Sequence, residues 1–300
     1  MTISYIIIMT AVLLSAVTFV LFGIDKHKAV KHKWRIPEAT LLLASVLGGV
    51  GGLLGMLFFH HKTRKWKFRI LVPLLAVLDV LVVSFFLWAL NYYHAGETAL
   101  AAMQSDDVVL VERTDNGWLF DGPSEDEALI FYPGAKVEET AYAPLLRSLA
   151  EEKMDVYLIR MPLHLAFFGL NAADSVIKNG TYDRYYLGGH SLGGAMAAVY
   201  AAGHEDEIAG EILLAAYPTK KTSVDTVLIY GSEDGVLNMT RVEKAKDLVT
   251  GRYDEYCIDG GNHAQFGDYG VQTGDREAWI TPEEQQKLAL EEIGRFFGES

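Results

Sequence analysis

Three apolar segments dominate the first 90 residues and constrain the fold more than any other feature of this sequence. They span residues 4–23, 39–59 and 70–90. A helix needs about 20 apolar residues to cross the hydrocarbon core of a bilayer, and each segment has that length. The middle segment also carries overlapping G-x-x-x-G spacings, which let helices approach closely in lipid, through Gly48, Gly49, Gly51, Gly52 and Gly55. We therefore expect an all-α transmembrane region of two to three segments within residues 1–93.

Positive charges orient such segments, because Lys and Arg favour the cytoplasmic side. Five lie in each of the two connecting loops: Lys26, Lys28, Lys31, Lys33 and Arg35, then Lys62, Arg64, Lys65, Lys67 and Arg69. Because the two loops carry the same number of positive charges, two arrangements stay open. Either all three segments span the membrane, or the middle segment is re-entrant and both loops lie on the cytoplasmic side. No positive charge follows the third segment until Arg113, so both arrangements predict that residues 94–300 lie outside the cytoplasm. A cleaved signal peptide is disfavoured, since no Lys or Arg precedes the first segment.

Ionisable residues in this region have alternative interpretations. Asp79 is either a functional intramembrane acid or an acid that faces a neighbouring helix. Four histidines lie among Lys and Arg, which repel a metal cation and suit anionic headgroups, so no metal site is expected at His27, His32, His60 or His61.

The same region resembles a small bacterial membrane-domain family of unknown function over about residues 20–68. The resemblance is carried, in order, by Gly23-Ile24-Asp25-Lys26, Arg35-Ile36-Pro37-Glu38, Leu47-Gly48-Gly49, Gly52, Gly55 and His61-Lys62-Thr63-Arg64. It implies membrane residence and no mechanism.

The remainder of the chain has a different composition. Residues 1–90 carry a net charge of +7, whereas residues 91–300 carry −20. An acidic domain argues against nucleic acid as a partner, because phosphate contacts need clustered Lys and Arg. The single cysteine, Cys257, excludes an internal disulfide. Short apolar runs alternate with amphipathic stretches, which predicts an α/β domain over residues 94–300 with a doubly wound, mostly parallel sheet.

The pattern places each element of that domain. Strands are expected at residues 108–112, 118–120, 128–132, 156–159, 185–187, 212–215, 226–230 and 255–258, and helices at residues 138–151, 172–178, 195–202, 242–249 and 282–297. Only about ten residues separate the sixth strand from the seventh, so no large cap domain is expected between them.

Gly189-x-Ser191-x-Gly193 lies between an apolar strand and a helix of small residues. This context fits a nucleophile elbow, in which the serine sits on a tight strand-to-helix turn. A serine hydroxyl becomes a nucleophile when a histidine, held by a carboxylate, removes its proton. Two histidines follow Ser191. His204 ends the helix after the elbow, where it suits the helix C-terminus, so we expect His263 to be the general base.

The acid should follow the strand at residues 226–230, within the turn Gly231-Ser232-Glu233-Asp234-Gly235. We expect Asp234, whose short side chain beside a glycine suits a tight turn, with Glu233 as the alternative. The oxyanion hole needs two backbone N–H groups, and we expect those of Leu192 and Ala135. The apolar segment at residues 161–170 is either a wall of the acyl pocket or ordinary core, and its His164 is expected to be structural.

Residues 128–297 resemble the α/β-hydrolase fold, and specifically a compact bacterial branch of it. The matching blocks are Phe131-Tyr132-Pro133-Gly134-Ala135-Lys136-Val137, Arg160-Met161-Pro162-Leu163, Gly188-Gly189-His190-Ser191-Leu192-Gly193-Gly194-Ala195-Met196 and Gly260-Gly261-Asn262-His263-Ala264-Gln265-Phe266-Gly267-Asp268-Tyr269-Gly270. Ala135 stands where a second glycine is usual. The alanine keeps the backbone N–H donor, and its side chain narrows the approach to that donor. The resemblance implies hydrolysis through an acyl-serine.

Together these features predict a membrane-anchored serine hydrolase that acts on a small-molecule or lipid-like ester without a cofactor. Thioesterase or peptidase chemistry on the same triad is an alternative, and so is a binding or sensor protein that kept the fold. The substrate and the oligomeric state are not determined by the sequence.

Overall fold

The computed structural model describes residues 2–123, 126–152 and 154–298. The chain forms two compact units, Met1–Asn91 and Tyr92–Ser300. The boundary lies two residues before the one expected after Tyr93. Tyr93 belongs to the second unit because its N–H donates to the Lys136 carbonyl oxygen at 2.7 Å and its own carbonyl oxygen accepts from the Glu138 N–H at 2.9 Å.

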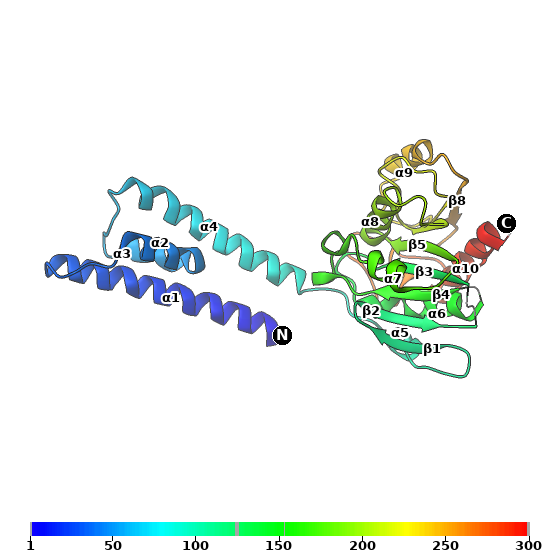
Figure 1. The fold of residues 1–300 in the computed structure, drawn as a ribbon, viewed down its shortest axis with the longest axis horizontal. Coiled ribbons are helices and arrows are strands. Elements are labelled where there is room, and N and C mark those ends of the chain that lie inside the picture. The colour runs from blue at the N-terminus through cyan, green and yellow to red at the C-terminus, as the bar shows by residue number, and fades with distance from the viewer. Residues whose placement is uncertain (1, 124–125, 153, 299–300) are drawn as a thin grey trace. The chain divides into compact units, whose positions relative to one another are not determined.

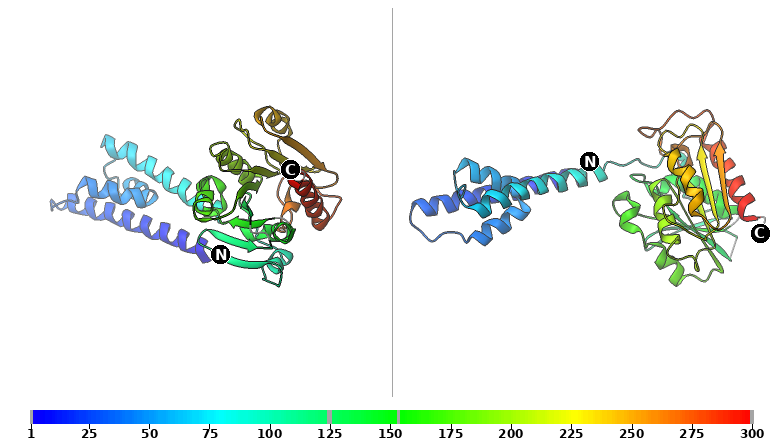
Figure 2. Two further views of the ribbon diagram at one scale, coloured as in Figure 1. Left: turned by 45° about the vertical axis from the view of Figure 1, so that its right-hand side comes forward. Right: turned by 90° about the horizontal axis from the view of Figure 1, so that it is seen from above.

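The first unit is all-α. Its helices are α1 (Thr2–Val30), α2 (Glu38–Leu47), α3 (Gly49–Phe58) and α4 (Trp66–Ala89). Figures 1 and 2 show α2 and α3 packed against the two long helices. Residues 39–59 do not form the single helix that a third span requires, because the chain breaks at Gly48 (φ −151°, ψ 50°). Each half has 10 residues, or about 15 Å of helix, which is half of the roughly 30 Å of a bilayer core.

Helices α1 and α4 are each long and apolar enough to cross a membrane. Only 11% of the most apolar window of each is buried. Apolar side chains such as Leu13 and Leu81 expose more than 60% of their surface. A core helix of a water-soluble domain buries such side chains, so the exposed apolar surface of α1 and α4 favours contact with lipid.

Glycines let α3 fit against both long helices. A Cβ atom added at Gly51 would overlap the Ser15 backbone of α1, and one added at Gly49 would lie 2.6 Å from the Ala76 nitrogen of α4. The Asp79 carboxylate of α4 accepts a hydrogen bond from the Gly49 N–H, at the first residue of α3. Asp79 thus faces a neighbouring helix, where it satisfies one of the N–H groups that a helix N-terminus leaves without a partner.

Asp25 joins the two basic loops. It is fully buried, and its carboxylate accepts from the Ile36 N–H at 2.8 Å and lies 3.5 Å from the Arg35 guanidinium, both in the first loop. From the second loop, His61 Nε2 lies at 2.8 Å and Lys62 Nζ at 3.2 Å. Both loops are therefore held at the same end of the first unit.

The second unit is built on one eight-stranded sheet. Its strands are β1 (Leu110–Thr114), β2 (Gly117–Asp121), β3 (Glu127–Tyr132), β4 (Asp155–Ile159), β5 (Arg184–His190), β6 (Gly210–Leu214), β7 (Thr226–Gly231) and β8 (Tyr253–Ile258). The order across the sheet is β1-β2-β4-β3-β5-β6-β7-β8. Strand β2 runs antiparallel to β1 and β4, and the other neighbours are parallel. The predicted doubly wound, mostly parallel sheet is confirmed.

Helices cover both faces of this sheet (Figure 1). They are α5 (Glu97–Ala102), α6 (Ala143–Glu152), α7 (Ala173–Asn179), α8 (Leu192–Ala201), α9 (Met239–Ala245) and α10 (Pro282–Gly298). Alternate side chains of β3 point to opposite faces of the sheet. Leu129 and Phe131 pack in the cluster that contains residues of α6 and α10. Ala128 and Ile130 pack in the cluster that contains residues of α7 and α8. A strand buried on both sides explains the continuous apolar runs in the sequence.

Two local features differ from the sequence expectation. The helix expected from residue 138 begins instead with a 3₁₀ turn at Glu139–Tyr142, and α6 follows it. Helix α5 was not anticipated, since six residues carry too little periodicity to identify a helix. No helix or strand lies between β6 and β7, so the expected absence of a large cap holds there.

Glu211 in β6 is a fully buried carboxyl whose charge is coupled to folding. The Thr226 hydroxyl lies 3.2 Å from Glu211 Oε2 and 2.9 Å from the Val224 carbonyl oxygen, two acceptors for its one proton. The other carboxyl oxygen, Glu211 Oε1, has no hydrogen-bond partner among the described residues. Burial raises the pKa of Glu211 to about 7, from 4.5.

A carboxyl whose pKa is raised by folding stabilises the fold below its unfolded pKa and loses that contribution as the pH rises through its folded pKa. We expect the wild-type protein to lose roughly 3 kcal/mol of stability between about pH 4.5 and pH 8 through this group. Glu211→Gln removes the ionisation, so the stability of the variant relative to that of the wild type should increase as the pH rises. Thermal unfolding of both proteins at about pH 5 and pH 8 measures this change. A difference in Tm that does not depend on pH would contradict the prediction.

Candidate active site

The predicted site residues come from the carboxyl ends of four parallel strands. Ala135 follows β3, Ser191 follows β5, Asp234 follows β7 and His263 follows β8. Because these strands run in the same direction, their carboxyl ends meet at one edge of the sheet. In open α/β sheets this edge is where ligands bind.

Ser191 has the backbone of a nucleophile elbow. Its φ of 53° and ψ of −122° lie in a region that residues with side chains rarely adopt. The flanking glycines make the turn possible, since a Cβ added at Gly189 would lie 2.6 Å from the Tyr132 carbonyl oxygen and one at Gly193 would overlap the same carbonyl. Helix α8 begins at the next residue, Leu192, so the positive end of its dipole faces the serine.

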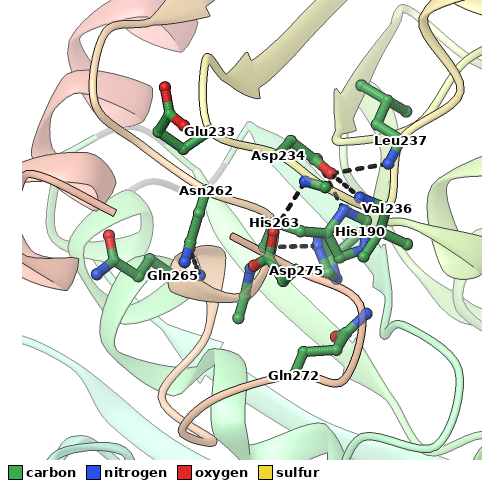
Figure 3. Close-up of polar contacts among 12 residues, drawn as sticks. His190, Glu233, Asp234, Val236, Leu237, Asn262, His263, Gln265, Gln272 and Asp275 are labelled. Carbon is green, nitrogen blue, oxygen red and sulfur yellow. Dashed lines mark hydrogen bonds and ion pairs between the residues drawn. The ribbon is translucent and has the colours of Figure 1, made fainter. Parts of the chain in front are cut away.

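Asp234 and His263 are in direct contact, as Figure 3 shows. His263 Nδ1 lies 2.8 Å from Asp234 Oδ2, and both side chains are about 1% exposed. The other carboxylate oxygen, Oδ1, accepts from the N–H groups of Val236 at 2.8 Å and Leu237 at 2.7 Å. Asp234 is thus fixed as an acceptor on both oxygens, which assigns the proton to Nδ1 of His263 and leaves Nε2 able to accept one.

The competing residues lie elsewhere. Glu233 points away from His263 (Figure 3) and pairs with the Arg276 guanidinium at 3.8 Å. His204, at the end of α8, stacks on Tyr200 with ring centroids 3.9 Å apart. His164 stacks on Tyr92 at 3.8 Å.

Ser191 and His263 are not joined by a hydrogen bond. Within residues 2–123, 126–152 and 154–298, Ser191 makes no side-chain capping bond and the buried Nε2 of His263 has no partner. In enzymes without bound substrate such bonds are often long and tighten in the complex. His263 Nε2 is therefore the buried nitrogen available to accept a proton.

The loop that follows β3, residues 133–137, leaves the Ala135 amide available. Its neighbours are engaged, since the Gly134 N–H donates to the Tyr142 hydroxyl at 3.1 Å and the Lys136 N–H donates to the His164 carbonyl oxygen at 2.7 Å. Across the described residues, neither the Ala135 nor the Leu192 N–H donates a hydrogen bond. These two amides are the expected oxyanion donors.

His190 is a buried member of the site that sequence reasoning missed. The Tyr142 hydroxyl accepts from Gly134 and donates to His190 Nδ1 at 2.8 Å, and His190 Nε2–H donates to the His263 carbonyl oxygen at 3.0 Å. Burial lowers the pKa of His190 well below its ordinary value, so the ring is neutral. His190 thereby connects the loop at residues 133–137, the elbow at Ser191 and the segment that carries His263. Its position before Ser191 was the only sequence signal.

The apolar segment at residues 161–170 divides between core and surface. Met161 and Ala166 are buried in the core cluster of α7 and α8. Phe167 and Phe168 are 47% and 49% exposed. Among the described residues, no group of three or more His, Cys, Asp or Glu side chains could hold a metal ion.

Comparison with known proteins identifies both parts of the chain. Residues 128–287, more than half of it, match the model of the alpha/beta hydrolase family. Residues 15–68 match a protein family of unknown function, DUF1294. A stretch of 76 residues is 45% identical to the uncharacterized protein YsdA of Bacillus subtilis, and covers 25% of this chain and 85% of that protein.

Two solved structures are similar to part of this chain. Est1E from Butyrivibrio proteoclasticus is 15% identical, with a TM-score of 0.46, over 64% of this chain and 100% of its own. The esterase Rv0045c from Mycobacterium tuberculosis is 11% identical, with a TM-score of 0.49, over 68% of this chain and 96% of its own.

Proposed function

The chain belongs to the alpha/beta hydrolase family in its second unit and to the DUF1294 family in its first. We propose that it is a membrane-anchored serine hydrolase that cleaves carboxylic esters. The observation that carries the proposal is the buried pair of Asp234 and His263 at 2.8 Å, at the same edge of the sheet as a serine held in the strained backbone of an elbow. Strain of this kind costs about 1–3 kcal/mol and persists at functional sites.

The reaction follows from the protonation states. His263 Nε2 takes the proton of Ser191 as Oγ bonds to the ester carbonyl carbon, and the N–H groups of Leu192 and Ala135 stabilise the oxyanion. Asp234 stabilises the imidazolium that forms. His263 then gives the proton to the leaving alkoxide, and the alcohol departs from the acyl-serine. Water, activated by the same nitrogen, releases the acid and restores the serine.

A substrate panel tests the proposal. We expect the purified full-length protein to react with a fluorophosphonate probe and to hydrolyse p-nitrophenyl esters in preference to thioesters and anilides. Faster hydrolysis of a thioester or an anilide would assign thioesterase or peptidase chemistry to the same triad. A protein that neither reacts with the probe nor hydrolyses any substrate of the panel would be the non-catalytic alternative, in which the fold serves binding.

We propose further that α1 and α4 cross the membrane and that α2 and α3 form a re-entrant hairpin. Each half of the hairpin spans about half of the bilayer core, and Asp25 contacts both basic loops. The hairpin therefore enters and leaves on one side. Trp34 and Trp66, which are 90% and 69% exposed, suit the interface there.

With ten positive charges on that side, the positive-inside rule assigns both loops to the cytoplasm. Helix α4 then leads outward, and the hydrolase unit is extracytoplasmic. Its proposed partners are the lipid bilayer and a small-molecule or lipid-like ester.

Labelling of cysteines with a membrane-impermeant maleimide tests this topology. The native Cys257 is exposed in the second unit and should react in intact spheroplasts. In a Cys257→Ser background, Lys33→Cys and Arg64→Cys should react only after permeabilisation. Reaction of either loop cysteine in intact spheroplasts would contradict the hairpin, because a third span would put one of the loops outside.

A further inference from the structure

The segment that follows His263 contains a carboxylate that hydrogen-bonds to the turn of Asp234 and to the turn of His263, without a hydrogen bond to either of these two side chains. Asp275 lies between β8 and α10, outside any helix or strand. Its Oδ2 accepts from the Ala264 N–H at 2.9 Å, and its Oδ1 accepts from the Gly235 N–H at 3.0 Å. Ala264 follows the base and Gly235 follows the acid, so one side chain links the residues next to the two members of the pair. Figure 3 shows Asp275 beside them.

The next residue strengthens the same link. The guanidinium of Arg276 donates to three carbonyl oxygens of the acid turn, those of Ser232 at 2.9 Å, Glu233 at 3.2 Å and Asp234 at 3.0 Å. Its own carbonyl oxygen accepts from the Asn262 side chain at 2.8 Å. Two consecutive residues thus contact both turns.

The sheet alone does not hold these turns together. The ladder between β7 and β8 ends at the pair Gly231 and Ile258, before Asp234 and His263. Beyond it, among the described residues, the Glu233 N–H donates to the Gly261 carbonyl oxygen at 2.8 Å, and Ser232 bonds to Ile258 and Gly260 at 2.9 Å each. All of these bonds lie before Asp234 and His263 in their turns. The contacts of Asp275 are the ones placed at the residues that follow the acid and the base.

We infer that Asp275 is a positioning residue, which keeps Asp234 and His263 in register for proton transfer. This inference rests on the proposed function of the triad. Catalytic groups displaced by about 1 Å cost up to 10²-fold in rate, so the loss of the bridge should lower kcat while the binding of substrate, and with it KM, changes little.

The test compares Asp275→Ala with Glu277→Ala, a matched control. Glu277 lies two residues away in the same segment, is exposed, and makes no hydrogen bond or ion pair with the residues that the structure describes. In the full-length protein we expect Asp275→Ala to lower kcat for ester hydrolysis about 10- to 100-fold, to slow fluorophosphonate labelling by a similar factor, and to broaden the proton resonance of the His263 Nδ1–H. Glu277→Ala should match the wild type in all three.

A double variant separates positioning from other roles. If Asp275 acts through the pair, its removal should cost less than about threefold in kcat once Asp234→Asn has already disabled the pair. An additive loss would overturn the inference, and so would wild-type kcat in Asp275→Ala. If Asp275→Ala only destabilises the fold, its Tm should fall while the His263 resonance of the remaining folded protein stays unchanged. That result would also count against the inference. If Ser191→Ala retains activity, the proposed function itself fails, whatever Asp275 does.

Discussion

Ser191→Ala should reduce kcat/KM for ester hydrolysis by about 10⁶-fold and abolish labelling by a fluorophosphonate probe. Alanine removes the only atom that can form the acyl bond, while the Asp234–His263 pair and the two oxyanion amides stay in place. The residual rate then comes from those groups acting on water, which accounts for about 10³- to 10⁴-fold over the uncatalysed reaction. Initial rates over a range of ester concentrations below and above KM, together with gel detection of the probe, measure the effect.

The control for this variant is another serine on the same unit. Ser148 lies in α6 and donates to the Pro144 carbonyl oxygen at 3.1 Å, away from the strand ends that carry the site. Ser148→Ala should label and turn over as the wild type does. Equal Tm values for the wild type and Ser191→Ala would show that the fold is intact, and labelling of Ser191→Ala at the wild-type rate would reject Ser191 as the nucleophile.

Asp234→Asn should lower kcat by about 10⁴-fold, with the fold retained. Asp234 uses both oxygens as acceptors, two bonds at Oδ1 and one at Oδ2. Asparagine has one oxygen. If that oxygen keeps the bonds to Val236 and Leu237, the amide –NH₂ faces His263 Nδ1, which must then be the unprotonated nitrogen. The proton moves to Nε2, and the imidazole can no longer accept one from the serine.

Glu233→Gln is the matched control, because the residue is adjacent, acidic and turned toward Arg276. A half-exposed ion pair contributes little, so this variant should keep kcat within about threefold of the wild type. The pH dependence of kcat/KM for both variants provides the second measurement. If Glu233→Gln caused the large loss and Asp234→Asn the small one, the assignment of the acid would be reversed.

The α/β unit could be predicted from the sequence because its signals are local. Buried parallel strands appear as apolar runs, the elbow as glycines at fixed spacing around Ser191, and the order of serine, acid and histidine as positions after successive strands. The structure confirms the fold and brings Asp234 and His263 into contact. It differs mainly at short elements such as α5, where six residues carry too little pattern.

Local sequence patterns predicted only part of the structure of the first unit. Hydropathy identified α1 and α4, yet it treated residues 39–59 as one segment, because a hydropathy profile does not show where a helix breaks and the chain turns. The break at Gly48 depends on how closely α3 fits against α1 and α4, and on the Asp79 carboxylate that accepts from Gly49. Those contacts join residues about 30 positions apart.

The two-part organisation, the class of fold and the residues proposed for the triad follow from composition, periodicity and spacing along the chain. The contacts of the folded chain were needed to find which acidic residue faces His263, that Asp25 contacts both basic loops, and that His190 and Asp275 hydrogen-bond to the turns of the pair. A hydrogen bond between distant segments leaves no periodic pattern in either of them, because it exists only once the chain has folded.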